Sequence, residues 1–255
     1  MLDNEAVAKA AASFRREADK EFDKAVKALI ALAFRYAEAG TDFLWDMDQQ
    51  LNAEAVRICR NLSDALAEKA KDIAAQVVKD ALAVEMDERD WDAVLASDDG
   101  EGEYYIPFLT RLDQQGSNLL ELLEIWIALA FLYDLSQSEL RVEISRYLSN
   151  PFLSRFWRNL PKGILKWGRG YSKDVRGQLE AIGQDAIVRA TRLSEWRKEK
   201  DGGATYYIRR RGSSYDCDEC DDACGYPIPI DVPFEWKHSR CLCFPEYHHE
   251  PFPTL

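Results

Sequence analysis

The chain has 255 residues, enough for one large domain or two smaller ones, and 47% of them are hydrophobic while 31% are charged. This composition supports a buried core and excludes a wholly disordered chain. The formal net charge of −12 argues against a protein that wraps duplex DNA with its whole surface, because phosphate binding needs a basic face.

One stretch departs from this acidic average. Residues 151–200 contain twelve Lys or Arg against five Asp or Glu. Its first four cations are Arg155, Arg158, Lys162 and Lys166. Two interpretations stay open at this point: a solvated helical face packed beside acidic neighbours, or a surface that meets nucleic acid or an acidic partner.

The N-terminus and the most apolar stretch indicate where the protein works. Met1-Leu-Asp-Asn-Glu5 has no basic flank and no apolar run, so no secretory signal is expected. Glu121, Glu124 and Asp134 interrupt the apolar stretch 119–135, which is expected as a buried helix because a membrane span needs roughly 20 apolar residues. We therefore expect a protein of a reducing cytoplasm, with no membrane partner, where six cysteines indicate metal more than disulfides.

Residues 1–150 are expected to be helical. Apolar residues recur at helical spacing over 5–38 and again over 43–95, where the pattern is long enough for two helices. The acidic residues along 85–103 are expected in a solvated loop, since Ser97 begins a run of turn-forming and acidic residues. Three further helices are expected beyond it: 104–115, 117–135 and 137–148.

The character of the chain changes in its last third. Asn150-Pro151 is expected to break the helical pattern, because proline disfavours the helical conformation in the residue before it. One more helix is expected from 173 to about 199, and the run 205–208 favours a strand. Cys59, by contrast, lies on the apolar stripe of an earlier helix and is expected to be a core thiol.

Five of the six cysteines lie between residues 217 and 243. They are arranged as Cys217-x2-Cys220-x3-Cys224, followed by His238-x2-Cys241-x-Cys243. A C-x2-C turn aims two sulfurs at one point, and a later pair can return to complete a tetrahedron, which suits Zn²⁺ with its preference for thiolate and imidazole. The pattern therefore predicts a zinc site, with buried thiols or disulfides as the alternative.

Four ligands are needed and the pattern offers six. The expected ligands are Cys217, Cys220, His238 and Cys241, with Cys243 or Cys224 as alternates. His248 and His249 lie beyond the cluster and are expected to be solvated. A closed site of four ligands leaves no position for water, so the zinc is expected to be structural, with no catalytic residue and no small-molecule substrate.

The cysteine pattern resembles the C-terminal signature of phage head morphogenesis proteins, the Mu F-like minor head protein family. The similar part runs from Cys217-x2-Cys220-x4-Gly225 through a proline-rich spacer to His238-x2-Cys241-x-Cys243. The lead-in is also similar. Arg189-Ala-Thr191-Arg192 lies on a predicted helix where the family carries an Arg-Thr-Glu element, and Tyr206-Tyr-Ile208 precedes the first cysteine as the family's strand does. The resemblance covers roughly 168–247.

The resemblance implies a mainly α protein. A multi-helix region, 1–150, would precede a Mu F-like module, 151–255, which ends in a small α+β zinc-stabilised part at 203–247. It implies a minor head protein of a tailed phage or prophage that contacts portal, major capsid or scaffold proteins, and packaged DNA through 151–200. Such a protein resides in the virion, at the portal or inside the capsid, and in the host cytoplasm during assembly.

Two other classes are weighed against this one. Mu F-like modules also occur beside ADP-ribosyltransferase toxin domains, but the sequence offers no trio of residues for an NAD pocket. A zinc-ribbon nucleic-acid binder or HNH-like nuclease would use base-stacking aromatics, such as Tyr206, Tyr207, Tyr215 and Trp236, and phosphate contacts from 209–211. Ten acids against five Lys or Arg from 201 to 255 disfavour that class.

Overall fold

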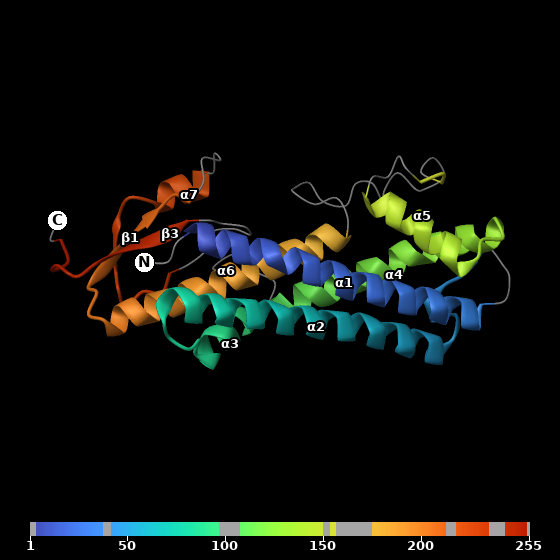
Figure 1. The fold of residues 1–255 in the computed structure, drawn as a ribbon, viewed down its shortest axis with the longest axis horizontal. Coiled ribbons are helices and arrows are strands. Elements are labelled where there is room, and N and C mark those ends of the chain that lie inside the picture. Colours follow the sequence, from blue (N-terminus) through green and yellow to red (C-terminus); the bar gives the residue numbers. More distant parts are fainter. Residues whose placement is uncertain are drawn as a thin grey trace. The chain divides into compact units, whose positions relative to one another are not determined.

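The structure is a computed structural model that describes residues 4–37, 42–96, 108–149, 154–156, 175–212, 218–234 and 243–253. The described chain is mainly helical and has a small three-stranded sheet near its C-terminus, which confirms the predicted mainly α fold with an α+β end (Figure 1).

The chain divides into two compact units whose segments interleave along the sequence. Unit 1 comprises Met1–Arg15, Ala67–Phe108 and Ile182–Leu255, and unit 2 comprises Arg16–Leu66 and Leu109–Ala181. Each unit takes segments from both sides of residue 150, because the units are defined by packing and not by position in the sequence. The predicted boundary between the regions 1–150 and 151–255 divides the sequence instead, and it stays a prediction.

The first helices follow the hydrophobic periodicity. α1 spans Asn4–Tyr36 and α2 spans Gln49–Leu82, preceded by a short 3-10 turn, η1, at Trp45–Met47. The Asp48 carboxylate accepts hydrogen bonds from the backbone N–H groups of Gln50 and Leu51 at 2.8 and 2.9 Å. This caps the first turn of α2, whose N–H groups have no partner within the helix.

The next helix, α3, spans Glu88–Ala96, as the helical pattern over 43–95 predicted, and corrects the expectation of an acidic loop for that part of 85–103; residues 97–103 lie outside the described residues. Asp90 is only 2% exposed. Its carboxylate accepts a hydrogen bond from the Ser194 hydroxyl at 2.9 Å and pairs with the Arg197 guanidinium at 2.8 Å. Burial raises the pKa of Asp90, and these two partners oppose that rise.

One continuous helix, α4, spans Phe108–Leu132, so the expected division near residue 116 is wrong. Gly116 lies within it, and a Cβ there would meet the Cβ of Cys59 at 3.0 Å. The glycine therefore allows a close approach to α2 instead of ending a helix. Cys59 is a buried core thiol, as predicted. It donates to the Gly116 carbonyl at 3.5 Å, and burial raises its pKa to about 12.

By length and composition alone, α4 is long and apolar enough to cross a membrane, a test that core helices of soluble proteins also pass. Its apolar face is packed against protein: Leu119, Leu123, Trp126 and Ile127 are all fully buried. The expectation of a buried helix in this stretch is confirmed for that face.

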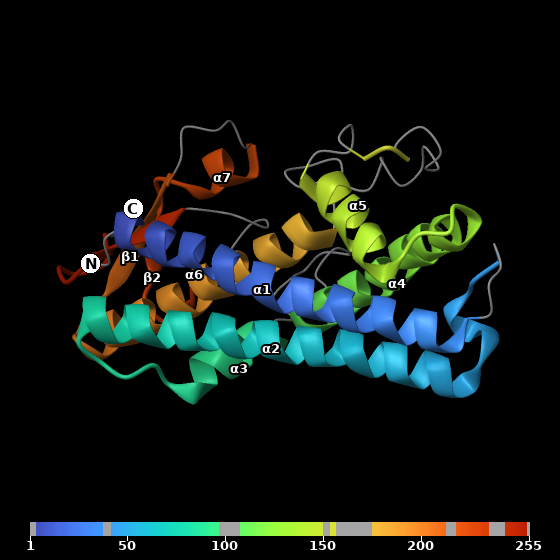
Figure 2. The same cartoon turned by 45° about the vertical axis from the view of Figure 1, so that its right-hand side comes forward.

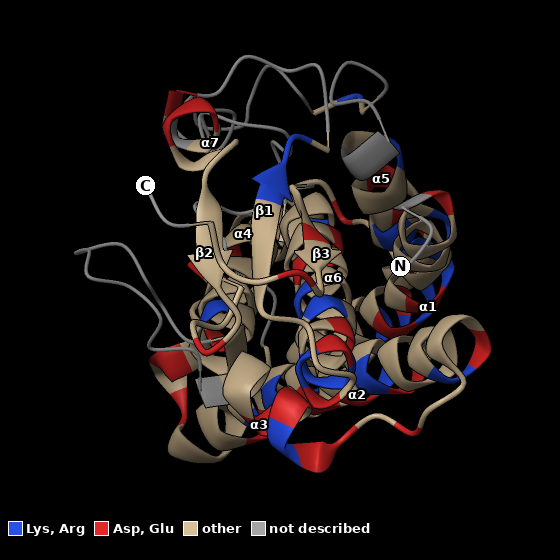
Figure 3. Ribbon diagram, turned by 90° about the vertical axis from the view of Figure 1, so that its left-hand side faces the viewer, with Lys and Arg blue, Asp and Glu red and all other residues tan. Residues whose placement is uncertain are grey.

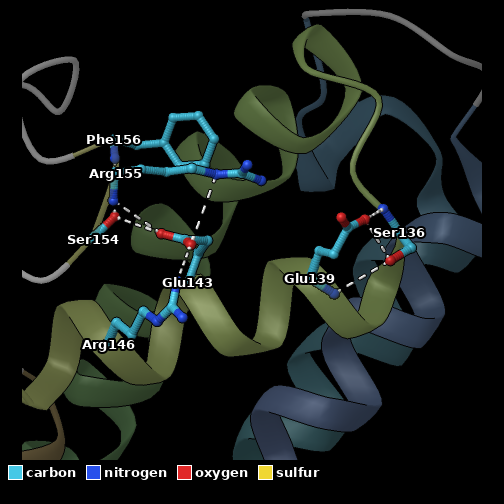
Figure 4. A network of polar contacts seen from close by, with 7 residues as sticks. All are labelled: Ser136, Glu139, Glu143, Arg146, Ser154, Arg155 and Phe156. Atoms are coloured by element: carbon cyan, nitrogen blue, oxygen red, sulfur yellow. Dashed lines mark hydrogen bonds and ion pairs between the residues drawn. The ribbon is translucent and has the colours of Figure 1, made fainter.

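The next helix, α5, spans Gln137–Ser149 and begins with a capping box (Figure 4). The Glu139 carboxylate accepts from the Ser136 N–H at 2.9 Å, and the Ser136 hydroxyl accepts from the Glu139 N–H at 3.3 Å. The hydrogen bonds from Ser136 lower the pKa of Glu139. The buried Glu143 carboxylate lies one turn further on and accepts hydrogen bonds from the Ser154 hydroxyl and the Arg155 N–H, both at 3.1 Å.

The long helix α6 spans Val175–Asp201, close to the helix expected over 173–199. The chain then turns through Gly203, whose φ of 87° lies in the left-handed region that glycine tolerates. Beyond it lie β1 (Tyr206–Arg210), the short helix α7 (Asp218–Ala223), β2 (Pro227–Pro229) and β3 (Phe244–His248).

The three strands form one antiparallel sheet in the order β2-β1-β3 (Figure 3). Tyr207 occupies the centre of the register, opposite Ile228 on one side and Tyr247 on the other. The strand expected at 205–208 is therefore confirmed and forms the middle of the sheet. Acidic side chains dominate α7, while the end of β1 is basic (Figure 3).

The close packing of α6 on α1 gives the first testable prediction. A Cβ at Gly183 would lie 2.1 Å from Cε1 of the fully buried Phe14 ring. We expect Gly183→Ala to lower the free energy of unfolding by about 1–3 kcal/mol, because overpacking outweighs the better helix propensity of alanine. Urea unfolding measures this change.

The double variant Phe14→Leu/Gly183→Ala is the control for that contact. It should cost less than the sum of the two single substitutions, because leucine leaves room for the new methyl group. Strict additivity would show that the two residues do not share this packing.

Candidate metal centre

The sheet and α7 bring two of the candidate ligands together. Cys220 lies on α7 and Cys243 lies immediately before β3, and each is 3% exposed. Both belong to one buried cluster. The other members of the cluster come from β1 and the segments around it: Ala204, Tyr207, Ile230 and Phe234.

A tight turn after α7 returns the chain to the sheet. Cys224 is half-buried against the same cluster. Gly225, which follows it, has a φ of 90°, and its N–H donates to the Arg209 carbonyl at 3.0 Å. A glycine is needed here because other L-residues are strained in this conformation. The glycine that closes the predicted C-x2-C-x4-G turn thus fixes α7 to β1.

Of the six candidate ligands, the described residues include Cys220, Cys224 and Cys243. The other three, Cys217, His238 and Cys241, lie outside the described residues. Within the described ranges, no group of three or more His, Cys, Asp or Glu is placed to hold a metal ion. Cys220, an expected ligand, thus shares its cluster with Cys243, an alternate. Two buried thiol side chains from the two halves of the pattern are a donor set that fits Zn²⁺.

Side chains from α6 and β1 hold the loop that follows β2 by hydrogen bonds. The indole N–H of Trp196 donates to the Ile230 carbonyl at 2.9 Å, and the Tyr207 hydroxyl donates to the Pro233 carbonyl at 3.1 Å. These bonds satisfy backbone carbonyls that no strand pairs. They hold the segment that leads from β2 toward the second half of the cysteine pattern.

The Arg189-x-Thr191-Arg192 element lies on α6, as predicted, and its side chains are buried. Arg189 pairs with Asp185 at 3.4 Å, and Arg192 pairs with Glu195 at 2.7 Å. Buried charges are tolerated only when paired, so these ion pairs make this face of α6 compatible with a protein interior. In each pair the acid and the arginine are four or three residues apart on the helix, a spacing that the sequence shows and that brings side chains together.

The arginines of α6 and β1 also lie over aromatic rings of the module. The Arg209 guanidinium is 4.7 Å from the Phe234 ring centre, and that of Arg192 is 6.0 Å from the Phe244 ring centre. Tyr247, in the same sheet, is mostly buried. Burial, reinforced by the negative charge of Glu195, raises its pKa above the ordinary range, so it stays neutral.

The His248 side chain is 20% exposed, so it is less solvated than expected from the sequence. Its ring stacks on Tyr206 with centroids 4.6 Å apart and planes 5° apart, and its Nδ1 lies 3.2 Å from Oε1 of Glu250. The Tyr206 hydroxyl donates to the same oxygen at 3.0 Å. His249 matches the expectation better, since its side chain is 55% exposed and lies 3.6 Å from Glu199.

Every described Lys or Arg of the basic stretch 151–200 has a carboxylate or carbonyl partner within the protein. Arg155 pairs with Glu143, and the Lys198 ammonium donates to the Leu82 carbonyl at 2.8 Å. The remaining described cations of the stretch, each with a carboxylate partner, are Arg176, Arg189, Arg192, Arg197 and Lys200. This favours a helical face packed beside acidic neighbours for the described part of the stretch.

Comparison of the chain with family models, with curated proteins and with solved structures found no match.

The two buried sulfurs give the second prediction. If Cys220 holds a zinc ion, Cys220→Ser should lower the free energy of unfolding of the sheet module by more than about 4 kcal/mol, because the loss of a metal ligand then adds to the loss of a buried thiol. Thermal melts with and without a zinc chelator measure this. The chelator should have no further effect on the variant.

Cys59→Ser is the matched control, since this thiol is also buried but lies in unit 2. It should cost about 1 kcal/mol and leave the response to the chelator intact. Equal losses in the two variants, with no chelator effect in either, would contradict a metal at Cys220. Comparing Cys243→Ser with Cys241→Ser then identifies the ligand nearest β3.

Proposed function

We propose that the protein is a minor head protein of a tailed phage or prophage. It acts by contact with portal, capsid or scaffold proteins and holds a structural zinc at its C-terminal end. The observation that supports the proposal most is the shared buried cluster of Cys220 and Cys243, which come from the two halves of the cysteine pattern. The order of elements agrees with the resemblance: α6 with Arg189 and Thr191, then β1, then the cysteine turn.

The zinc would supply stability that the sheet module cannot obtain from its own core. Six buried residues form the cluster, and two of them are cysteines. A core of this size contributes little free energy, so small modules of this kind depend on metals or disulfides. Cys220 with Cys217 would hold the metal from one side, and His238 with Cys241 or Cys243 from the other. The metal would join α7 to the start of β3.

The described residues weigh against nucleic-acid binding by the sheet module. Tyr206 and Tyr207, which a zinc ribbon would use for stacking, are buried. Arg209 is buried too. Arg210 pairs with Glu246, and Arg211 pairs with Asp221 at 2.5 Å. Side chains engaged in this way are poorly placed to meet bases or phosphates, which leaves protein contact as the better-supported role.

The proposed contact with packaged DNA is limited to a shorter segment than 151–200. Residues 157–174 lie outside the described residues and contain five cations against the single acid Asp174. The five are Arg158, Lys162, Lys166, Arg169 and Lys173. Arg155, whose charge Glu143 already compensates, is left out of this proposal.

The head assignment predicts that the protein is part of the virion. Mass spectrometry of particles purified after induction of the source strain should detect it in DNA-filled heads. A strain that carries only Cys220→Ser should incorporate less of it, while Cys59→Ser should incorporate as much as the wild type. Absence of the protein from purified particles, with normal expression in the cell, would contradict the assignment.

The DNA contact predicts an effect of charge reversal. Arg158→Glu/Lys162→Glu/Lys166→Glu should lower DNA retention in heads, since each lost phosphate contact weakens binding. The matched control reverses three cations with exposed side chains elsewhere: Lys20, Lys24 and Lys79. The same DNA retention in both triple variants would refute the contact and leave the protein contacts as the sole role.

A further inference from the structure

A groove of about 560 Å³ runs between α1 and α2 within unit 1. The two helices are antiparallel there (Figures 1 and 2). Its floor is made by small and apolar side chains from the first turns of α1 and the last turns of α2: Ala6, Ala10, Ser13, Ile73, Val77 and Ala81.

These residues form a second apolar stripe on each helix. The core-facing stripe of α1 is already occupied by buried residues such as Val7 and Phe14, and that of α2 by Ala74 and Val78. Surface helices of a globular protein ordinarily carry one apolar stripe. A second stripe at helical spacing indicates a further packing partner.

The small side chains on α1 suit a helical partner. Ala6, Ala10 and Ser13 recur at intervals of four and three residues, as the contact positions of packed helices do. With so little side chain above the backbone, another helix can approach closely and place larger residues in the groove. Ile73 and Val77 on the opposite side of the groove are residues of that larger kind.

The two rims carry opposite charge. Lys9 lies on the α1 rim and makes no hydrogen bond or ion pair with any residue that the structure describes. Asp80 lies on the α2 rim, where it accepts a hydrogen bond from the Gln76 amide at 2.7 Å. In a dimer whose two-fold axis runs along the groove, the Lys9 rim of each copy lies against the Asp80 rim of the other. Such a dimer therefore contains two Lys9–Asp80 pairs. The surface is therefore complementary to itself in both shape and charge.

From this self-complementarity we infer that the occupant of the groove is a second copy of this chain. In the dimer, α1 of each protomer packs on α2 of the other, which gives an antiparallel four-helix arrangement. The part of α1 within unit 1 ends at Arg15, so the contact extends for about 18 Å along the helix. An interface of this length is at the small end of specific interfaces, and the dimer dissociates in the micromolar range.

Analytical ultracentrifugation of the full chain from about 1 to 200 µM tests the dimer. The wild type should change from monomer to dimer across this range. Lys9→Glu and Asp80→Lys should each weaken the dimer by about tenfold, because two attractive rim pairs become repulsive. A monomer at all concentrations overturns the inference.

Mixing the two single variants gives the sharpest result. In a heterodimer of Lys9→Glu with Asp80→Lys, both rim pairs are attractive again, so the mixture should associate about as tightly as the wild type. The control is Lys20→Glu, the same charge change at an exposed position of α1 outside the groove, which should leave the dimer intact. Circular dichroism verifies that every variant is folded. A dimer that is indifferent to the rim variants, or a mixture that fails to regain affinity, also overturns the inference.

Discussion

The link between α7 and the sheet is the shared burial of Cys220 and Cys243 in one cluster. Cys220 lies within the short helix α7 and Cys243 immediately before the edge strand β3, and four other described residues are buried in the same cluster. Two antiparallel pairings of a short central strand provide little stability by themselves. A core of this size offsets only part of the conformational entropy that ordering α7 and the strands costs. A metal ion held by Cys220 and by the second half of the cysteine pattern would add stability to this part of the chain.

Charge compensation is the second organising feature. The chain is strongly acidic, yet the described cations of its one basic stretch are held by carboxylates or carbonyls, several of them in the interior. Arg192 with Glu195, and Arg197 with Asp90, connect α6 to its own turns and to α3. Removing one partner of such a pair leaves an uncompensated buried charge, at a typical cost of about 3–5 kcal/mol. The described cations of this stretch are therefore engaged in intramolecular contacts that stabilise the fold.

Sequence periodicity predicted the helices well because amphipathic spacing is a local property. α1, α2, α5 and α6 lie where the apolar residues indicated, and β1 lies at the β-prone run after Gly203. The predicted division near residue 116 was wrong, since Gly116 admits Cys59 from a distant helix and does not end its own. Asp90 was likewise misjudged, because its partners lie far along the chain; Ser194 is 104 residues from Asp90. The ligand pattern was visible in the sequence, but spacing alone did not reveal that Cys220 shares a buried cluster with Cys243.

Native mass spectrometry of the intact protein, purified without added zinc, tests whether the chain holds a structural metal. We expect one zinc per wild-type chain, and no zinc in Cys217→Ser/Cys220→Ser, whose sheet module should no longer melt cooperatively. A metal-free wild type with the same cooperative melt would contradict the structural zinc, and with it the main support for a role in head assembly.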